Sequence, residues 1–513
     1  MSKAAKTTFQ VMVLTILSKV LGLFREQVLA ASYGTSIYAD AYITAMKMPN
    51  MIFAAIGAAI ATSLIPVYSK INENEGTDKA QSFLNNLINV VLVICMVIVV
   101  LGIIFAEPLV KAFAMGFNGE KLAITINFVR IILLAIIFIG LNNIIASYLQ
   151  LNNNFITPAL IGIPLNLIII AAILLSLKTN VYVLIVGSLI GLLSQVLFQI
   201  PAVKRAGYKY KLKIDLSDPN MRHLVILVLP VVIGVGVEQI NTIIDGTLAS
   251  TFGNGVVSAF NYANRLYGFV QALFVASILS VIYPMMAKSI AANNQIEFKN
   301  SVRKTMNSII LFIIPISVGT MVLAEPIVKV LFQRGKFNAS DTLMTANILI
   351  VYIIGIIAFS LRHVISKAFY SIQDTKTPMI NGAISIIFNI VLNIILSKYL
   401  GYIGLAIATS ISAFIGLALF YISLRKKIGN FGGKQILVTS IKCSISAIIM
   451  GIATFVSYKY TSSILGLGFI NEVIILGTSI GTGAIVYGIA VILLKVEEVS
   501  LMVGLVRDKL KKN

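Results

Sequence analysis

The sequence predicts an all-α polytopic membrane protein with fourteen transmembrane helices. Hydrophobic residues make up 58% of the 513 positions and charged residues 12%, and the mean hydropathy is +0.96. An ordinary soluble domain has about 25% charged residues. Apolar runs of about 20 residues, long enough to cross a hydrocarbon core of ~30 Å, recur along the whole chain. Helices are expected because they satisfy their own backbone groups inside a bilayer.

Short polar connections separate the fourteen predicted spans. The spans are 9–31, 37–69, 83–106, 122–149, 158–177, 182–202, 223–251, 258–287, 305–328, 342–371, 378–397, 403–424, 435–456 and 470–494. With the N-terminus in the cytoplasm, cytoplasmic segments hold 24 of the 40 Lys and Arg residues and outer loops hold 8. Short cytoplasmic loops are enriched in these residues, so we expect both termini to be cytoplasmic.

The net charge of +21 does not indicate a nucleic-acid partner, because the basic residues lie in short loops between spans. Cys95 and Cys443 fall within predicted spans, so no disulfide framework or metal cluster is expected. The basic linker 203–222 is expected to contact anionic headgroups. The tail from Val496 has the pattern of a short interfacial helix.

Internal repeats indicate two copies of a six-helix unit. The segment Ala106-Glu-Pro-Leu-Val-Lys111 recurs as Ala324-Glu-Pro-Ile-Val-Lys329, and Thr157-Pro158 recurs as Thr377-Pro378. Six helices separate the copies, so both have the same orientation. Such parallel copies in transporters rock around a site at their interface; the alternative is a duplication that only enlarged the bundle. The predicted domains are an N-lobe (1–202), the linker (203–222), a C-lobe (223–424), and two further helices with a tail (425–513).

Twelve charged residues lie at predicted membrane depth. They are Lys19, Arg25, Lys47, Arg130, Arg265, Arg362, Lys367 and Lys442, with the acids Glu26, Asp40, Glu238 and Asp245. An isolated charge at the bilayer centre costs about 2.5–3.5 kcal/mol on insertion scales, so it normally faces a wet cavity or a partner. Arg130 and Lys442 are near span ends, where long side chains reach the interface, and we assign them no function.

Helical spacing places several of these residues on shared faces. The three groups are Asp40, Thr44 and Lys47; Glu238, Asn241 and Asp245; and Ser258, Asn261, Tyr262 and Arg265. They lie on the second, seventh and eighth helices, which belong to the equivalent first pairs of the two lobes. The pattern predicts a polar, partly cationic central cavity, and the alternative is polar pairing that holds helices together.

The residue types indicate the chemistry of this cavity. Lys19, Arg25, Lys47 and Arg265 suit an anion, and arginine offers a planar fork for phosphate oxygens. Glu238, Asn241 and Asp245 suit a hard cation or a proton.

Gly22 lies between Lys19 and Arg25, which point about 120° apart on a regular helix. A break at Gly22 would let both cations line one cavity and would direct a helix end towards an anion.

Motifs for bond-breaking chemistry are absent from the sequence. There is no phosphate-binding Gly-Lys-Ser/Thr loop, so the chain is not expected to hydrolyse ATP. His223 and His363 are far apart in the sequence, and no nucleophile–base pair is recognisable. We therefore expect a transporter, without an enzymatic activity and without a bound cofactor.

Five groups of residues are shared with one known family. They are Ser18-Lys-Val-Leu-Gly-Leu-Phe-Arg-Glu26; Ala39-Asp-Ala-Tyr42 with Lys47-Met-Pro-Asn50; Leu331-Phe-Gln-Arg-Gly335; Ala368-Phe-Tyr370; and Gln373-Asp-Thr-Lys-Thr-Pro378. On these motifs the sequence resembles the MurJ/MviN lipid II flippases, of the multidrug/oligosaccharidyl-lipid/polysaccharide exporter superfamily.

The resemblance implies alternating-access transport of lipid II, the undecaprenyl-diphosphate-linked peptidoglycan precursor, across the bacterial cytoplasmic membrane for cell wall synthesis. It implies that basic cavity residues bind the diphosphate and that a membrane potential or ion gradient drives transport. Positions matching the family's substrate-binding residues are Lys19, Arg25, Ala30, Asp40, Ser258 and Arg265. The two additional helices are implied to form a groove for the lipid tail.

Two positions depart from the family pattern. The stretch 51–55 lacks a basic residue that is common in the family, and Gly268 replaces a frequent acid. One diphosphate contact is therefore missing or is supplied by Lys47. Some relatives carry a sodium site, for which Asn241, Asp245 and Asp374 are the candidates here.

Other functions remain open on the sequence alone. A flippase for another polyprenyl-linked glycan is one, and a cation-coupled multidrug exporter, which would have acidic and aromatic cavity walls, is a second. A scaffolding membrane protein is a third, but it leaves the cost of the buried charges unexplained. We expect lipid II and membrane lipids as partners, sodium or protons as coupling ion, and a monomer.

Overall fold

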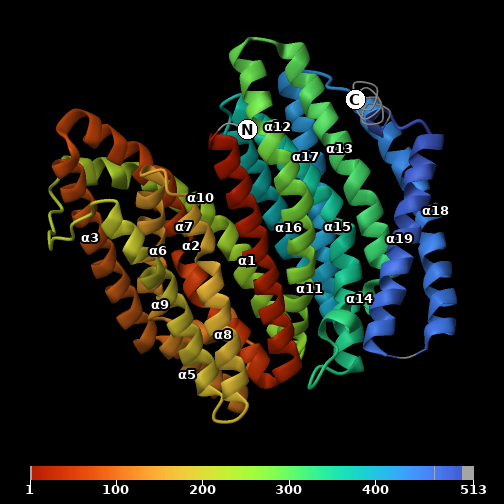
Figure 1. Ribbon diagram of the computed structural model, residues 1–513, viewed down its shortest axis with the longest axis horizontal. Coiled ribbons are helices and arrows are strands. Elements are labelled where there is room, and N and C mark those ends of the chain that lie inside the picture. The colour runs from red at the N-terminus through yellow and green to blue at the C-terminus, as the bar shows by residue number, and fades with distance from the viewer. Residues whose placement is uncertain (1–2, 467, 500–513) are drawn as a thin grey trace. The chain divides into compact units, whose positions relative to one another are not determined.

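The computed structural model describes residues 3–466 and 468–499 and is helical almost throughout (Figure 1). The helices are α1 (Lys3–Tyr33), α2 (Ile37–Glu75), α3 (Thr77–Ile104), α4 (Ala106–Phe113), α5 (Gly119–Ile132), α6 (Ala135–Leu151), α7 (Ile156–Leu160), α8 (Gly162–Ser176), α9 (Tyr182–Arg205), α10 (Pro219–Ser250), α11 (Val256–Val270), the π-helix η1 (Gln271–Val275), α12 (Ala276–Ala291), α13 (Gln295–Val322), α14 (Ala324–Phe332), α15 (Ala339–Ser371), α16 (Lys376–Leu400), α17 (Tyr402–Ile428), α18 (Gly433–Leu465) and α19 (Phe469–Leu493). The prediction of an all-α fold is confirmed.

The number of membrane-crossing helices is consistent with the predicted fourteen. Within the described residues, ten helical segments are long and apolar enough to cross a membrane. An eleventh is added if α5 and α6, which meet at a bend of 41°, form one span. The helices α1, α2 and α10 stand outside that group but have 31, 39 and 32 residues, which exceeds the length a span requires.

The repeated Ala-Glu-Pro motif has the same local structure in both copies. It begins α4 in the first copy, within a segment expected as an outer loop, and α14 in the second, where the helix starts inside the predicted span 305–328 and continues into the expected loop. In the first copy Lys111 pairs with Glu107 at 2.6 Å, one turn away. In the second copy Lys329 pairs instead with Glu472 of α19. The copies have therefore diverged, and the second one holds the C-terminal helix pair.

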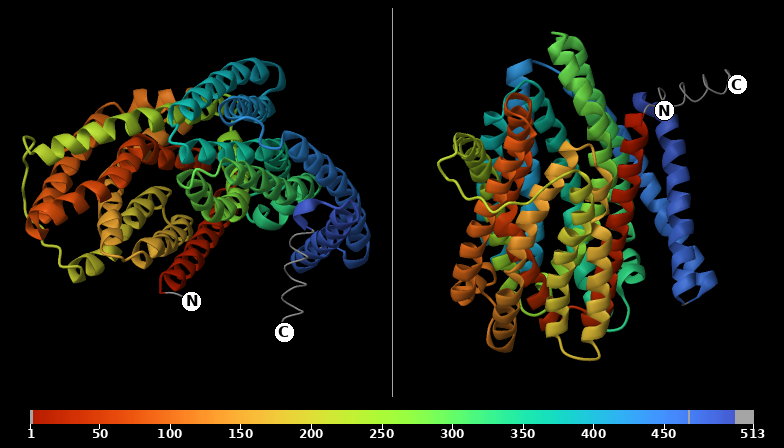
Figure 2. Two further views of the ribbon diagram at one scale, coloured as in Figure 1. Left: turned by 90° about the horizontal axis from the view of Figure 1, so that it is seen from above. Right: turned by 60° about the vertical axis from the view of Figure 1, so that its left-hand side comes forward.

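Helix packing divides the chain into two compact units. The first comprises Met1–Ser258 and Arg334–Asn338, and the second Ala259–Gln333 and Ala339–Asn513. In the first unit α2 packs against α3, α5, α6 and α10, while α1 lies along α8 (Figures 1 and 2). The first unit thus includes α10, the first helix of the second repeat. The lobe boundaries predicted from the repeats stay predictions.

The second unit is built on α13, α15 and α17. Helix α13 packs against α15 and α18, α16 against α17, and α18 against α19 (Figure 1). A polar row on α16, Asn381, Ser385, Asn389 and Asn393, repeats every four residues and is buried. Asn389 donates to Ser412 Oγ of α17 at 3.1 Å. Such interhelical bonds join membrane helices at about 0.6 kcal/mol each. The predicted interfacial helix of the tail lies outside the described residues beyond position 499.

Candidate functional site

Helix α1 is one continuous α-helix from Lys3 to Tyr33, so it has no break at Gly22. A Cβ at Gly22 would be 3.9 Å from the side chain of Asn166, an ordinary contact with α8. Because the helix is regular, Lys19 and Arg25 point about 120° apart and do not share one face. Lys19 is exposed, whereas Arg25 is partly buried.

Arg25 forms an ion pair with the neighbouring residue on α1. Its Nη2 atom donates to Glu26 Oε1 at 2.7 Å, with 16% of the Arg25 side chain and 4% of the Glu26 side chain exposed. The bulk of the guanidinium's charge is therefore compensated within one turn of helix. This pairing answers why an acid accompanies the cations at membrane depth.

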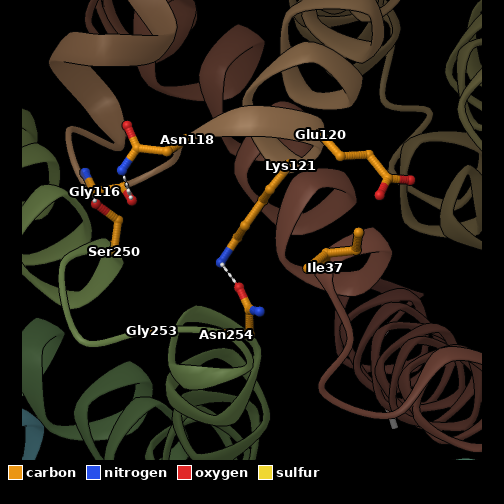
Figure 3. Close-up of a pocket in the computed structure, with 8 residues that line it drawn as sticks. All are labelled: Ile37, Gly116, Asn118, Glu120, Lys121, Ser250, Gly253 and Asn254. Carbon is orange, nitrogen blue, oxygen red and sulfur yellow. Dashed lines mark hydrogen bonds between the residues drawn. The ribbon is translucent and has the colours of Figure 1, made fainter.

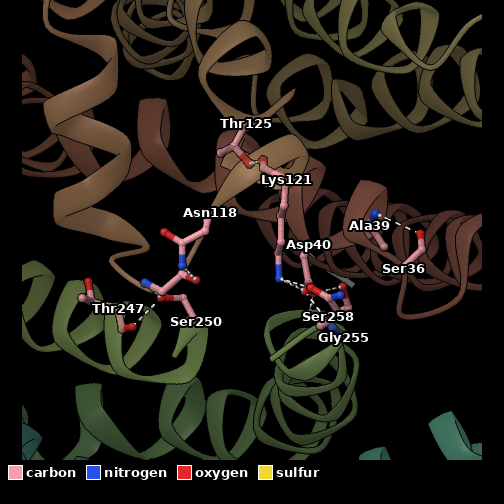
Figure 4. A network of polar contacts seen from close by, with 12 residues as sticks. Ser36, Ala39, Asp40, Asn118, Lys121, Thr125, Thr247, Ser250, Gly255 and Ser258 are labelled. Atoms are coloured by element: carbon pink, nitrogen blue, oxygen red, sulfur yellow. Dashed lines mark hydrogen bonds and ion pairs between the residues drawn. The ribbon is translucent and has the colours of Figure 1, made fainter. Parts of the chain in front are cut away.

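Asp40 is the centre of a buried polar network at the start of α2 (Figure 4). Ser36 caps the helix, and Asp40 lies in its first turn with no exposed surface. Lys121 Nζ of α5 donates to Asp40 Oδ2 at 2.6 Å, and the Gly255 N–H donates to the same oxygen at 2.8 Å. Ser258 donates to Asp40 Oδ1 from its N–H at 2.8 Å and its Oγ at 2.5 Å.

This network makes Asp40 the cap of another helix. Gly255 and Ser258 flank the first residues of α11, whose backbone N–H groups have no intrahelical acceptor. A carboxylate at this place satisfies them and complements the helix dipole. Gly255 has φ +86°, and a Cβ there would lie 2.5 Å from Thr35 Oγ1, so a side chain is excluded. The structure thus brings together two predicted substrate-binding residues, Asp40 and Ser258.

A cavity of about 380 Å³ adjoins the network (Figure 3). It is lined by Ile37, Gly116, Asn118, Glu120, Lys121, Ser250, Gly253 and Asn254. Lys121 reaches Asn254 Oδ1 at 3.4 Å and also lies 4.0 Å from the centre of the Phe117 ring. One cation, one acid, two amides and a hydroxyl group make this wall suited to hydrogen bonding. Across the described residues no three His, Cys, Asp or Glu side chains are grouped as a metal site would require.

Lys121 is a residue of the candidate site that the sequence analysis does not identify. It was counted with the outer-loop cations, whereas it lies in the first turn of α5 and is buried to 6% exposure. The usable signal was Asp40 itself, because a buried carboxylate needs a cation. Nothing in the spacing showed which cation would supply it.

The motif containing Gly335 also contributes to the first unit. The Lys336 N–H donates to the Ala31 carbonyl at 2.9 Å, next to the end of α1. Gly335 has φ +56°, and a Cβ there would lie 2.3 Å from the Ala31 oxygen. Lys336 Nζ is 5.7 Å from the centre of the Tyr33 ring. Glycine is therefore required for this segment to approach α1.

The remaining anion-binding candidates lie on two helices. Lys47 is partly buried on α2, on the face that carries the buried Asp40 and Thr44. Arg265 is exposed on α11 and belongs to the second unit. Their role in substrate binding stays a prediction.

The cation-coupling candidates are placed as follows. On α10, Asn241 Nδ2 lies 3.5 Å from Asp245 Oδ2, and the side chain of Glu238 lies outside the described part. Asp374 belongs to the second unit, where it caps α16 by accepting from Thr377 N at 3.0 Å and Thr377 Oγ1 at 2.6 Å. Lys427 Nζ donates to Asp374 Oδ2 at 2.6 Å. The bonds from Lys427 and Thr377 lower the pKa of the Asp374 carboxyl well below its usual range.

A comparison with known structures identifies the fold first. An inward-facing multidrug resistance MATE family transporter of the MOP superfamily matches with a TM-score of 0.71, covering 82% of this chain and 98% of that one at 14% identity. At this identity the match concerns the fold alone, which is the helical architecture of MOP-superfamily transporters.

The comparison with protein families is more specific than the comparison of folds. Residues 29–476 match the family described as lipid II flippase MurJ, and the chain belongs to this family. A probable lipid II flippase MurJ of Vibrio cholerae is 30% identical over 432 residues, which is 81% of this chain and 82% of the relative. The Haemophilus influenzae relative with the same description is 28% identical over 508 residues, covering 95% and 99% of the two chains. The solved structure of lipid II flippase MurJ in an inward closed conformation matches with a TM-score of 0.80 at 28% identity, covering 94% and 98%.

Proposed function

We propose that this chain translocates lipid II across the bacterial cytoplasmic membrane, for cell wall synthesis, by alternating access. The observation that carries the proposal is the match to a lipid II flippase over 94% of the chain with a TM-score of 0.80. The family match over residues 29–476 supports it independently of the coordinates. Both termini are assigned to the cytoplasm by the distribution of Lys and Arg.

The charges support an anionic substrate over the cationic drugs of related exporters. Lys19, Arg25, Lys47 and Arg265 are cations at predicted membrane depth. Arg25 is held by Glu26 here, and a diphosphate would offer its guanidinium additional charge-assisted bonds. The substrate would therefore add to or replace an existing pair, which limits the cost of keeping the cation buried. Another polyprenyl-diphosphate glycan would be recognised by the same groups.

The Asp40 network has a structural role within the first unit. It joins α2, α5 and the start of α11 through a carboxylate without exposed surface. With cytoplasmic termini, the α1–α2 turn and the network beside it lie on the outer side. We infer that the network holds the first turn of α11 against α2 and α5 within the first unit.

The proposal includes the driving force of transport and the oligomeric state. A membrane potential, or sodium or protons acting at Asn241 and Asp245, drives the cycle, and no resident cofactor takes part. The chain acts as a monomer and catalyses no bond cleavage.

Depletion of the protein in a bacterium without a second flippase tests the proposal. Lipid II exposure on the outer leaflet should fall and should be restored by the wild-type chain. Arg25→Ala should fail to restore it, whereas the control Arg130→Ala should succeed, because Arg130 is exposed near the end of a span. Unchanged exposure after depletion would rule out lipid II as the substrate.

A further inference from the structure

We propose that residues 208–216, here called the linker strand, form a docking element for anionic phospholipids at the cytoplasmic surface of the bilayer. The linker strand lies between α9 and α10 within the first unit. The proposal concerns the membrane and does not depend on which substrate is transported.

Three buried asparagines of α3 hold the backbone of the linker strand. Asn85, Asn86 and Asn89 have at most 3% of their surface exposed. Their amides bind main-chain groups of alternate residues: Asn85 binds Lys209 O at 3.1 Å and Lys211 N at 3.0 Å, Asn86 binds Asp215 O at 2.7 Å and Asp215 N at 2.8 Å, and Asn89 binds Lys211 O at 3.2 Å and Lys213 O at 3.1 Å. The backbone of the segment is therefore held against α3 at positions 209, 211, 213 and 215.

Side chains of the segment complete the attachment. Tyr208 OH donates to Asn85 Oδ1 and Tyr210 OH donates to Asn89 Oδ1, both at 2.6 Å. Lys213 Nζ donates to Ser82 Oγ at 3.1 Å. Buried amides are costly when unpaired, so these bonds stabilise one register of the strand on α3.

The main-chain groups of the linker strand point towards and away from α3 at alternate positions. Main-chain groups of positions 209, 211, 213 and 215 face α3, so those of the intervening positions face away. The positions between them carry exposed apolar side chains, with Leu212 79% and Ile214 55% exposed, and Leu216 in the following turn is 66% exposed. Tyr210 is 57% exposed although its hydroxyl group binds Asn89 of α3. A row of four exposed apolar residues in a polar linker indicates a surface that is covered in the cell.

The apolar part of α3 indicates that the lipid bilayer covers this exposed surface of the linker strand. From Asn89 the same helical face continues, at spacings of four, seven and eleven, as Val93, Met96 and Val100, whose side chains are exposed. The face changes from amide to apolar within one turn, about 6 Å along the axis. The polar zone of a bilayer is about 5–8 Å deep on each side of the hydrocarbon. The linker strand therefore lies at headgroup depth, beside the lipid-facing part of α3.

The basic residues in and beside the linker strand favour anionic phospholipids. Lys209, Lys211 and Lys213 alternate with the apolar positions, and Lys204 and Arg205 precede them at the end of α9. Basic residues beside apolar ones bind bilayers that contain anionic lipid and discriminate against zwitterionic ones. A peptide pairing with the outward main-chain edge is the competing occupant, but the adjoining apolar face of α3 favours the membrane.

A single tryptophan tests the placement, because the chain has none of its own. The variant Leu212→Trp is reconstituted as the full chain in phosphatidylcholine vesicles with or without phosphatidylglycerol, and its emission is quenched with brominated lipids. We expect blue-shifted emission that brominated phosphatidylglycerol quenches more strongly than brominated phosphatidylcholine. Ile104→Trp, on the exposed apolar part of α3, sets full quenching, and Asn74→Trp, in the exposed polar end of α2, sets none.

The outcomes separate the two occupants. Red-shifted, unquenched emission from Leu212→Trp, equal to that of Asn74→Trp, would overturn the membrane assignment and leave the peptide edge as the alternative. Replacing Lys209, Lys211 and Lys213 by Gln in the Leu212→Trp background should lower the preference for phosphatidylglycerol at least about tenfold. Equal quenching by both lipids before this replacement would overturn the anionic preference. Circular dichroism and Ile104→Trp quenching verify that the variants are folded and inserted.

Discussion

At the scale of single residues, the pair of Asp40 and Lys121 is the most consequential contact in the first unit. Both side chains are buried, and Asp40 has three further donors from Gly255 and Ser258. Removing one member of a buried pair leaves an uncompensated charge. We therefore expect the loss of either charge alone to destabilise the folded protein.

Asp40→Asn should destabilise the purified protein by about 3–5 kcal/mol, because Lys121 is then buried without its carboxylate. Lys121→Met should destabilise it by a similar amount. The double variant should recover part of the loss, since both charges are gone, although the cap of α11 remains weakened. Thermal unfolding in detergent measures all three, and strictly additive losses would show that the two groups are not coupled.

The sequence predicted part of this site for a clear reason. A charge in an apolar segment is costly, so Asp40 is recognisable from the sequence, as are Arg25 and Glu26, whereas the pairing of Arg25 with Glu26 appears only in the structure. Lys121 did not, because a cation next to a loop has water as an alternative partner. Whether it folds back onto Asp40 depends on where α5 begins, which hydropathy does not resolve.

At the scale of elements, Gly22 does not break α1. Gly22 suggested a break, but the helix is continuous and Gly22 instead packs against α8. Its neighbours continue the helix because tertiary contacts outweigh the lower helix propensity of one glycine, about 1 kcal/mol.

Gly22→Ala should therefore stabilise the protein by about 0.5–1 kcal/mol without abolishing transport, since the added methyl group meets Asn166 at an ordinary distance. Thermal unfolding and lipid II exposure on complementation are the two measurements. Greater stability with transport lost would mean that α1 must bend at Gly22 during the cycle.

The start of α16 depends on Asp374, whose pKa is lowered by its bonds to Lys427 and Thr377. A depressed pKa stabilises the folded state above the unfolded value of about 3.9, and the contribution is lost as the pH falls through the folded value. Asp374→Asn should lower the free energy of unfolding by up to about 1 kcal/mol at pH 7, because the amide oxygen can still accept from Thr377 but no longer carries the charge that pairs with Lys427.

The difference between Asp374→Asn and wild type should narrow as the pH falls from 5 to 2, as followed by thermal unfolding. A difference independent of pH would show that the ion pair of Asp374 with Lys427 does not contribute to stability. The variant also separates two roles: retained sodium response in transport would exclude Asp374 from the coupling site.

At the scale of elements, hydropathy predicted the long helices but did not predict α4 and α14 as separate short helices. The predicted span 122–149 is two helices, α5 and α6, with a 41° bend. Helix α4 lies in an expected loop, and α14 starts inside the predicted span 305–328 and ends in the expected loop, because helices of eight or nine residues cannot span a bilayer on their own. The repeated motif marked both places without indicating their structure.

At the scale of the whole molecule, sequence motifs identified the family before any coordinates, and the family match over residues 29–476 confirms it. The helical architecture followed from composition because a bilayer permits few alternatives. The coupling ion did not follow, since it depends on which polar side chains converge in each conformation. Asn241 and Asp245 are neighbours on α10, and their use by an ion stays a prediction.

The central claim is that this chain moves a polyprenyl-diphosphate glycan across a bilayer, and translocation of fluorescent lipid II in proteoliposomes tests it most directly. With an imposed membrane potential, the wild-type chain should make internal lipid II accessible to an external quencher, whereas Arg25→Ala should reduce the rate at least about tenfold, given the strength of charge-assisted bonds to a diphosphate. Arg130→Ala should match the wild type. Wild-type vesicles that expose no more lipid II than protein-free vesicles, with the protein shown to be folded, would contradict the account.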